Sequence, residues 1–130
     1  MAYRQGMTFE PRSMVEQKDA FGHVAGLLKP AAGIESSDHR YRAAMVQHVM
    51  ARKIREGLKL RGQKVTTFVE ELGDVPGASA DRVRRLLRGE TSATFADLAF
   101  WATEFPVVTK EVMRYLEHWT KATNETRESR

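Results

Sequence analysis

The sequence contains no cysteine, which excludes disulfides, thiolate nucleophiles and cysteine-bound zinc and fits a reducing compartment. No stretch approaches the roughly 20 consecutive apolar residues that span a bilayer. The first residues, MAYRQGMTFEPR, lack the apolar run of a secretory signal. We therefore expect a cytoplasmic protein with no membrane partner.

The patterns that usually mark catalysis or metal binding are also missing. The four histidines are far apart and show no i, i+4 ligand spacing, so we expect them at the surface or half-buried: His23, His39, His48 and His118. The chain has no Gly-x-Ser-x-Gly, Walker-type loop or dinucleotide fingerprint. We expect no metal, no cofactor, no small-molecule effector and no enzymatic activity.

The chain has enough apolar residues for one core, and its positive charge is unevenly distributed. Its 130 residues are 42% hydrophobic, which suits one ordinary domain. Residues 40–90 hold 12 Lys and Arg against 6 Asp and Glu, whereas the remainder holds 9 against 11. Such local positive charge is what a polyanion requires, although solvated helix faces carry similar charge.

Glycine and proline divide the sequence into helical segments, and no long β-type alternation occurs. The pattern predicts an all-α fold, a bundle of five to six helices. The predicted helices cover residues 14–28, 36–61, 67–72, 79–88, 94–105 and 110–121. We divide the chain into an N-terminal extension with one short helix (1–36), a main domain (37–108) and a C-terminal helix with a tail (109–130).

Two short predicted helices, 67–72 and 79–88, are joined by a glycine-containing break, an arrangement that can place the second helix in the DNA major groove. At about 100° per residue, the apolar Val83, Leu86 and Leu87 share one side of the second helix. Four arginines occupy the rest of its surface: Arg82, Arg84, Arg85 and Arg88. Arginine suits two-point recognition of guanine, but on a solvated surface these side chains would only pair with nearby carboxylates.

Residues 58–108 contain glycine, apolar and helix-capping residues at characteristic distances from one another. They are Gly62 and Phe68, Gly73, Val83, the pair Arg88-Gly89, and the Thr94-capped series Leu98, Ala102 and Phe105. In this pattern the stretch resembles the Cro/phage-repressor (XRE) family of helix-turn-helix domains. The resemblance implies a lambda-repressor-like fold that binds double-stranded DNA.

The resemblance also implies roles for individual residues. The positions nearest the base edges are Ser79, Arg82, Arg84 and Arg85, with Asp81 touching a cytosine amino group or orienting a neighbouring arginine. Lys64, Thr66, Thr67 and Arg88 are better placed for phosphates. The basic face of the preceding helix, at Arg52, Arg55 and Lys59, would extend the backbone contact.

The function implied is a sequence-specific transcriptional regulator, most simply a repressor of phage or mobile-element type. We expect a homodimer, formed through residues 110–121, residues 14–28 or both, because a lone helix-turn-helix buries little DNA surface. The connection from Gly73 to Ser79 is longer than the family's tight turn. It leaves open an alternative, a protein-interaction module of antitoxin-like or adaptor type.

Overall fold

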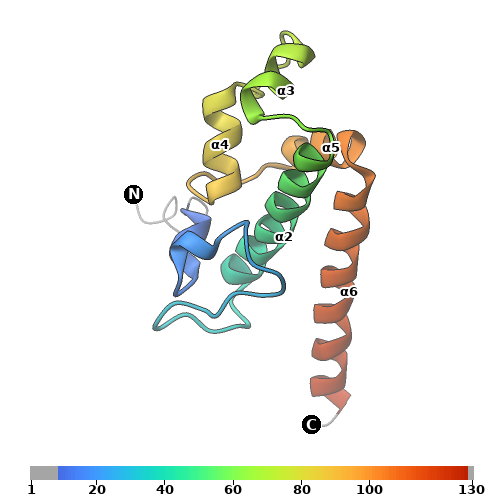
Figure 1. Cartoon of the computed structure of the whole chain (residues 1–130). Coiled ribbons are helices and arrows are strands. Elements are labelled where there is room, and N and C mark those ends of the chain that lie inside the picture. Colours follow the sequence, from blue (N-terminus) through green and yellow to red (C-terminus); the bar gives the residue numbers. More distant parts are fainter. Residues whose placement is uncertain (1–8, 129–130) are drawn as a thin grey trace.

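The computed structural model describes residues 9–128, and within this range the protein is an all-α bundle (Figure 1). The elements are two 3-10 turns, η1 (Pro11–Met14) and η2 (Lys18–Ala20), and five α-helices: α2 (His39–Leu60), α3 (Val65–Leu72), α4 (Ala80–Arg88), α5 (Phe95–Glu104) and α6 (Pro106–Glu128). The described residues form no β-strand, only an isolated bridge between Val15 and Pro30. The predicted fold class is confirmed.

The long helix α2 lies between α4 on one side and α6 on the other (Figure 1). It begins one residue after Asp38, whose side chain accepts a hydrogen bond from the backbone N–H of Arg40 at 2.8 Å. Buried residues occur on both sides of this helix, among them Met45 and Ile54, each with no exposed area. A helix buried on two sides can hold the other helices in place.

The two short helices α3 and α4 occur where the sequence predicts them. Ser79 caps α4 by accepting from the backbone N–H of Arg82 at 3.2 Å, and Gly89 ends the helix in the left-handed region with φ of 75°. Both residues suit these roles, because a hydroxyl satisfies a free N–H and glycine tolerates positive φ. By contrast, α3 starts at Val65, two residues before the predicted range 67–72.

The last two helices meet at a proline. Thr94 and Asp97 form the predicted capping box at the start of α5. Pro106 is the first residue of α6, where its missing N–H costs no helical hydrogen bond. The C-terminal helix is therefore longer than the predicted 110–121 and includes much of the segment that we assigned to a tail.

The predicted helix over residues 14–28 is wrong. Gly22 and Gly26 have φ of 77° and 81°, values that a right-handed α-helix does not contain. A Cβ added at Gly22 would lie 2.6 Å from the carbonyl oxygen of Leu87, so this backbone packs closely against the end of α4. The two glycines favour turns that follow the surface of the bundle, and residues 9–36 form no α-helix that could pair in a dimer.

One cluster of buried side chains connects the whole described chain. It includes Met14 and Phe21 from the N-terminal segment and Val112 from α6. At its upper end, the ring centroid of Phe68 lies 5.4 Å from that of Trp101 and 6.0 Å from that of Phe105. These rings join α3 to α5. None of the helices in residues 9–128 combines the length and apolarity needed to cross a membrane.

Candidate nucleic-acid interface

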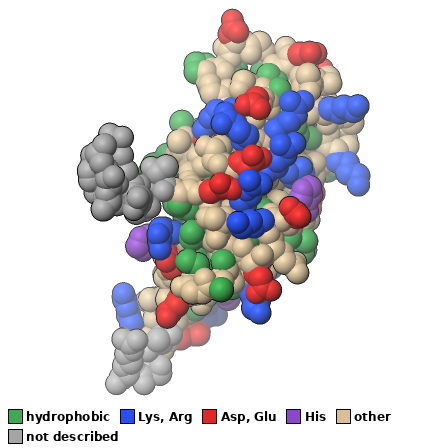
Figure 2. Space-filling model, turned by 90° about the vertical axis from the view of Figure 1, so that its left-hand side faces the viewer, with side chains coloured by type: hydrophobic (Ala, Val, Ile, Leu, Met, Phe, Trp, Pro, Cys, Tyr) green, Lys and Arg blue, Asp and Glu red, His purple; other side chains and the backbone are tan. Residues whose placement is uncertain are grey.

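The helix α4 has a buried side and an exposed side. Val83, Leu86 and Leu87 are at most 2% exposed and pack in the core. The exposed residues are Asp81, Arg84, Arg85 and Arg88. Both sets lie where the helical period predicts them. Figure 2 shows the resulting face of the molecule, a band of Lys and Arg side chains with several carboxylates among them.

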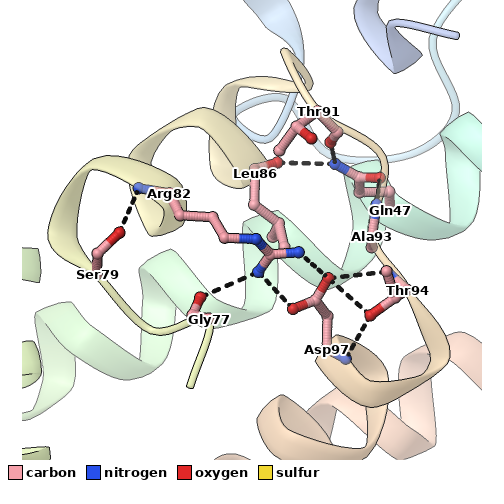
Figure 3. Close-up of polar contacts among 9 residues, drawn as sticks. All are labelled: Gln47, Gly77, Ser79, Arg82, Leu86, Thr91, Ala93, Thr94 and Asp97. Atoms are coloured by element: carbon pink, nitrogen blue, oxygen red, sulfur yellow. Dashed lines mark hydrogen bonds and ion pairs between the residues drawn. The ribbon is translucent and has the colours of Figure 1, made fainter. Parts of the chain in front are cut away.

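The guanidinium of Arg82 turns back into the protein (Figure 3). It donates to both carboxylate oxygens of Asp97 at 2.6 and 2.7 Å, and also to the carbonyl oxygen of Gly77 at 3.1 Å. Two parallel hydrogen bonds between arginine and a carboxylate fix both position and orientation. In this arrangement Arg82 holds α4 against the start of α5, whereas the family resemblance implied a place nearest the base edges.

The same pair explains two shifts in acidity. Hydrogen bonding to Asp97 raises the pKa of Arg82. Burial acts to raise the pKa of Asp97, but hydrogen bonds from Arg82 and Thr94 outweigh burial and leave that pKa below its usual value. Both groups therefore stay charged at neutral pH, and the contact is a true ion pair.

Arg84 connects the two short helices. Its Nη2 donates to the hydroxyl oxygen of Thr66, in the first turn of α3, at 2.6 Å. Both residues are exposed. The pair brings a residue predicted to contact bases and a residue predicted to contact phosphates to one surface.

Arg85 and Arg88 are accessible cations of α4. Arg85 pairs with Asp81 at 3.1 Å and its side chain is 50% exposed, while Arg88 lies 3.6 Å from Glu90 and is 59% exposed. Exposed ion pairs of this kind contribute about 0–1 kcal/mol. An incoming phosphate or base can replace these carboxylates at little cost.

The remaining predicted contact residues lie at the starts of the two helices. Lys64 precedes α3, and Thr66 and Thr67 form its first turn with exposed side chains. Ser79 is exposed at the start of α4, but its hydroxyl oxygen already caps the helix. The structure thus places Lys64, Thr67 and Ser79 at the surface beside the exposed arginines.

Two further arginines lie beside the C-terminal end of α4. The backbone N–H of Arg12 donates to the carbonyl oxygen of Gly89 at 3.0 Å, and Arg55 Nη2 donates to the carbonyl oxygen of Leu87 at 3.3 Å. Burial, and then the charge of Arg88, lowers the pKa of Arg55. No sequence signal indicated Arg12, because its segment reaches α4 only through the fold. Arg52, by contrast, pairs with Glu56 along α2 at 3.4 Å.

Gln47 also fixes the C-terminal end of α4 (Figure 3). Its amide nitrogen donates to the carbonyl oxygens of Leu86 and Thr91 at 2.9 and 2.8 Å, and its amide oxygen accepts from the N–H of Ala93 at 2.7 Å. Gln47 is only 4% exposed. Sequence reasoning missed it, because its partners lie some forty residues away along the chain.

His48 has no exposed area, so the expectation of surface or half-buried histidines is wrong at this position. Its Nδ1 accepts from the N–H of Gly22 at 2.7 Å, and its Nε2 lies 3.0 Å from the carbonyl oxygen of Gly26, to which it donates. The ring holds the N-terminal turn beside α4. Among the described residues, no group of His, Asp and Glu is arranged to hold a metal ion.

Comparison with known proteins adds no relative. The chain matches no family model, and neither the curated proteins nor the solved structures include a significant match. Interpretation of this surface rests on its own geometry and charge.

Proposed function

We propose that this chain binds duplex DNA through a helix-turn-helix formed by α3 and α4, and acts as a sequence-specific transcriptional regulator. One observation carries the proposal: α4 presents Arg84, Arg85 and Arg88 outward, while its opposite side is fixed in the core. A rigid helix with several exposed arginines fits the major groove, which admits an α-helix and displays the guanine O6 and N7 acceptors.

The surroundings of each side chain indicate whether it would contact a base, contact a phosphate or position α4. Arg85 is the best candidate for base contact, because its side chain is exposed and its ion-pair partner Asp81, one helical turn away, is exposed too. Lys64, Thr67 and Arg88 are exposed and are suited to phosphates, which set the register of the protein on DNA. Arg82 is a positioning residue, since its guanidinium is held by Asp97.

The simplest regulatory mode is repression by occluding a promoter, with two copies bound to half-sites about 34–36 Å apart. For pairing we favour the outer side of α6, where Val107 and Met113 are 40% and 49% exposed. The test is sedimentation of Met113→Glu beside the unaltered protein. Loss of dimers only in the variant supports this surface, and a monomeric unaltered protein contradicts it.

The test of DNA binding is a selection from random genomic duplex fragments, followed by affinity measurements over a salt series. The triple variant Arg84→Ala/Arg85→Ala/Arg88→Ala removes three charges from α4. Its matched control, Lys18→Ala/Lys29→Ala/Arg40→Ala, removes three charges outside α3, α4 and the pairing helix α6. We expect the unaltered protein and the control to retain a common site, and the α4 variant to lose it.

The salt dependence gives a second criterion. Each lost phosphate contact should reduce the slope of log affinity against log salt by about 0.9. If no protein holds duplex DNA even at low salt, or if both triple variants lose affinity equally, the proposal is wrong. The first of these results would favour the protein-interaction module.

A further inference from the structure

The helices α2 and α6 diverge along their length. Near its start, α6 packs tightly on the core, with Val108 fully buried and Val112 only 3% exposed. One turn later, Leu116 is 44% exposed. Figure 1 shows α6 separating from α2 towards the C-terminal end. The two helices therefore form a wedge that is closed at one end and open at the other.

This wedge contains a groove with a volume of about 720 Å³. Small-molecule sites typically occupy about 300–1,000 Å³ and are mainly apolar with a few polar groups. The walls of this groove fit that description: Val46 and Met50 from α2, Leu98 from α5, and Val112, Leu116 and Trp119 from α6. Phe95, which is 93% exposed, stands at the mouth. The groove can receive an aliphatic chain.

The charge at the open end is positive. Of the described residues that line the groove, none is Asp or Glu, whereas His39, Arg42 and Arg127 lie where α2 begins and α6 ends. The guanidinium carbon of Arg42 lies 5.8 Å from the centre of the Trp119 ring, and its Nε makes a long hydrogen bond, 3.4 Å, to a backbone oxygen.

We propose that this groove binds an amphipathic anion such as a fatty acid, with the aliphatic chain between α2 and α6 and the carboxylate at Arg42. Charge complementarity selects this occupant, since an anion gains attraction that a neutral chain lacks. A second copy pairing groove to groove would offer Arg42 no carboxylate from the described lining. The proposal does not depend on DNA binding.

The test uses the full chain and brominated dodecanoate below its micelle concentration, with quenching of Trp119 fluorescence as the signal. Brominated dodecanol and a dodecyl ammonium salt carry the same chain with neutral and positive heads. We expect saturable binding of one dodecanoate per chain, about tenfold tighter than the alcohol, a difference that corresponds to ~1.4 kcal/mol. Arg42→Gln should remove this preference.

Two matched variants test the location. Ala43 is exposed and lines the groove, so Ala43→Phe should fill the groove and abolish binding. Ala99 is exposed on α5 and does not line it, so Ala99→Phe should bind normally. Equal binding of all three head groups, or equal loss in both variants, overturns the proposal. So does a dimer in sedimentation that Ala43→Phe dissociates, because the groove would then belong to a second copy.

Discussion

Arg82 and Arg85 lie three residues apart on α4, yet the structure gives them opposite surroundings. The Arg82 side chain is 26% exposed and is paired with Asp97 on another helix. The Arg85 side chain is 50% exposed and is paired with Asp81 within its own helix. One arginine fixes where α4 lies, and the other is available from outside. A loss of DNA binding on mutation therefore means something different at each position.

The largest effect on stability should come from the inner arginine. Arg82→Met leaves Asp97, whose side chain is 12% exposed, without its partner. Removing one member of a buried pair typically costs 3–5 kcal/mol; because Arg82 is partly exposed, we expect a loss of about 2–3 kcal/mol in the free energy of unfolding. Arg85→Met, the matched control, should change it by less than about 0.5 kcal/mol. Urea unfolding measures both.

A double-mutant cycle sharpens this comparison. If Arg82 stabilises the protein through Asp97, then Arg82→Met/Asp97→Asn should cost less than the two single substitutions together. Strictly additive costs would show that the pair has no coupling. Full stability of Arg82→Met combined with loss of one preferred base would instead assign Arg82 to base contact and refute its positioning role.

The next effect concerns Gln47, which holds the C-terminal end of α4. Gln47→Leu keeps the side-chain volume close to that of glutamine but removes the partner of two carbonyl groups and one N–H. We expect a loss of about 2 kcal/mol, since a buried unsatisfied group costs about 1–3 kcal/mol and water can reach part of this site. Gln17→Leu, at an exposed position, is the control. Equal unfolding midpoints for the two variants would contradict this role.

The features predicted correctly depend on local signals. Ser79, Thr94 and Gly89 cap or end helices through hydrogen bonds and φ angles within a few residues, so their neighbours in the sequence suffice to predict them. The buried side of α4 likewise follows from the helical period.

The features missed or predicted wrongly depend on distant contacts. In the sequence, Arg82 cannot be distinguished from the other arginines of α4. Its different role becomes visible only when the fold brings Asp97 of α5 beside it. Gln47 and His48 bind segments far along the chain, and no local pattern indicates either bond. The prediction of a helix over residues 14–28 failed because it gave the periodic apolar residues more weight than Gly22 and Gly26, which both adopt positive φ. Of the two, Gly22 packs against the end of α4, a contact between segments far apart in the sequence.

A smaller effect, dependent on pH, should come from His48. Burial lowers the pKa of His48 below 6.5. The hydrogen bond to Gly26 acts to raise this pKa, whereas the charges of Arg52 and His23 lower it further. The unfolded chain then binds more protons than the folded chain between the folded pKa and 6.5, so stability should fall as pH decreases through that window and level off above it. The slope cannot exceed about 1.4 kcal/mol per pH unit for one group.

Urea unfolding between about pH 5 and pH 7.5 measures this effect of one buried imidazole. His48→Gln should reduce the dependence more than His23→Gln does, because His23, whose pKa is also lowered by burial, is an exposed residue, whereas His48 is fully buried. An unchanged slope in His48→Gln would mean that another group titrates. Because His48 holds the turn beside α4, the same titration tests the contacts that fix α4 against the rest of the protein.

The smallest effect on folding should accompany Arg85→Lys, which keeps the charge on the outer side of α4. Lysine can satisfy a phosphate but cannot reproduce the two parallel hydrogen bonds that arginine makes to guanine. If Arg85 contacts a base, Arg85→Lys should relax preference at one base pair by about 1–3 kcal/mol while the salt slope stays the same. Arg88→Lys, by comparison, should leave sequence preference intact, because a phosphate contact carries no sequence information. Equal loss of sequence preference in the two variants would contradict the assignment of Arg85 to a base and Arg88 to a phosphate.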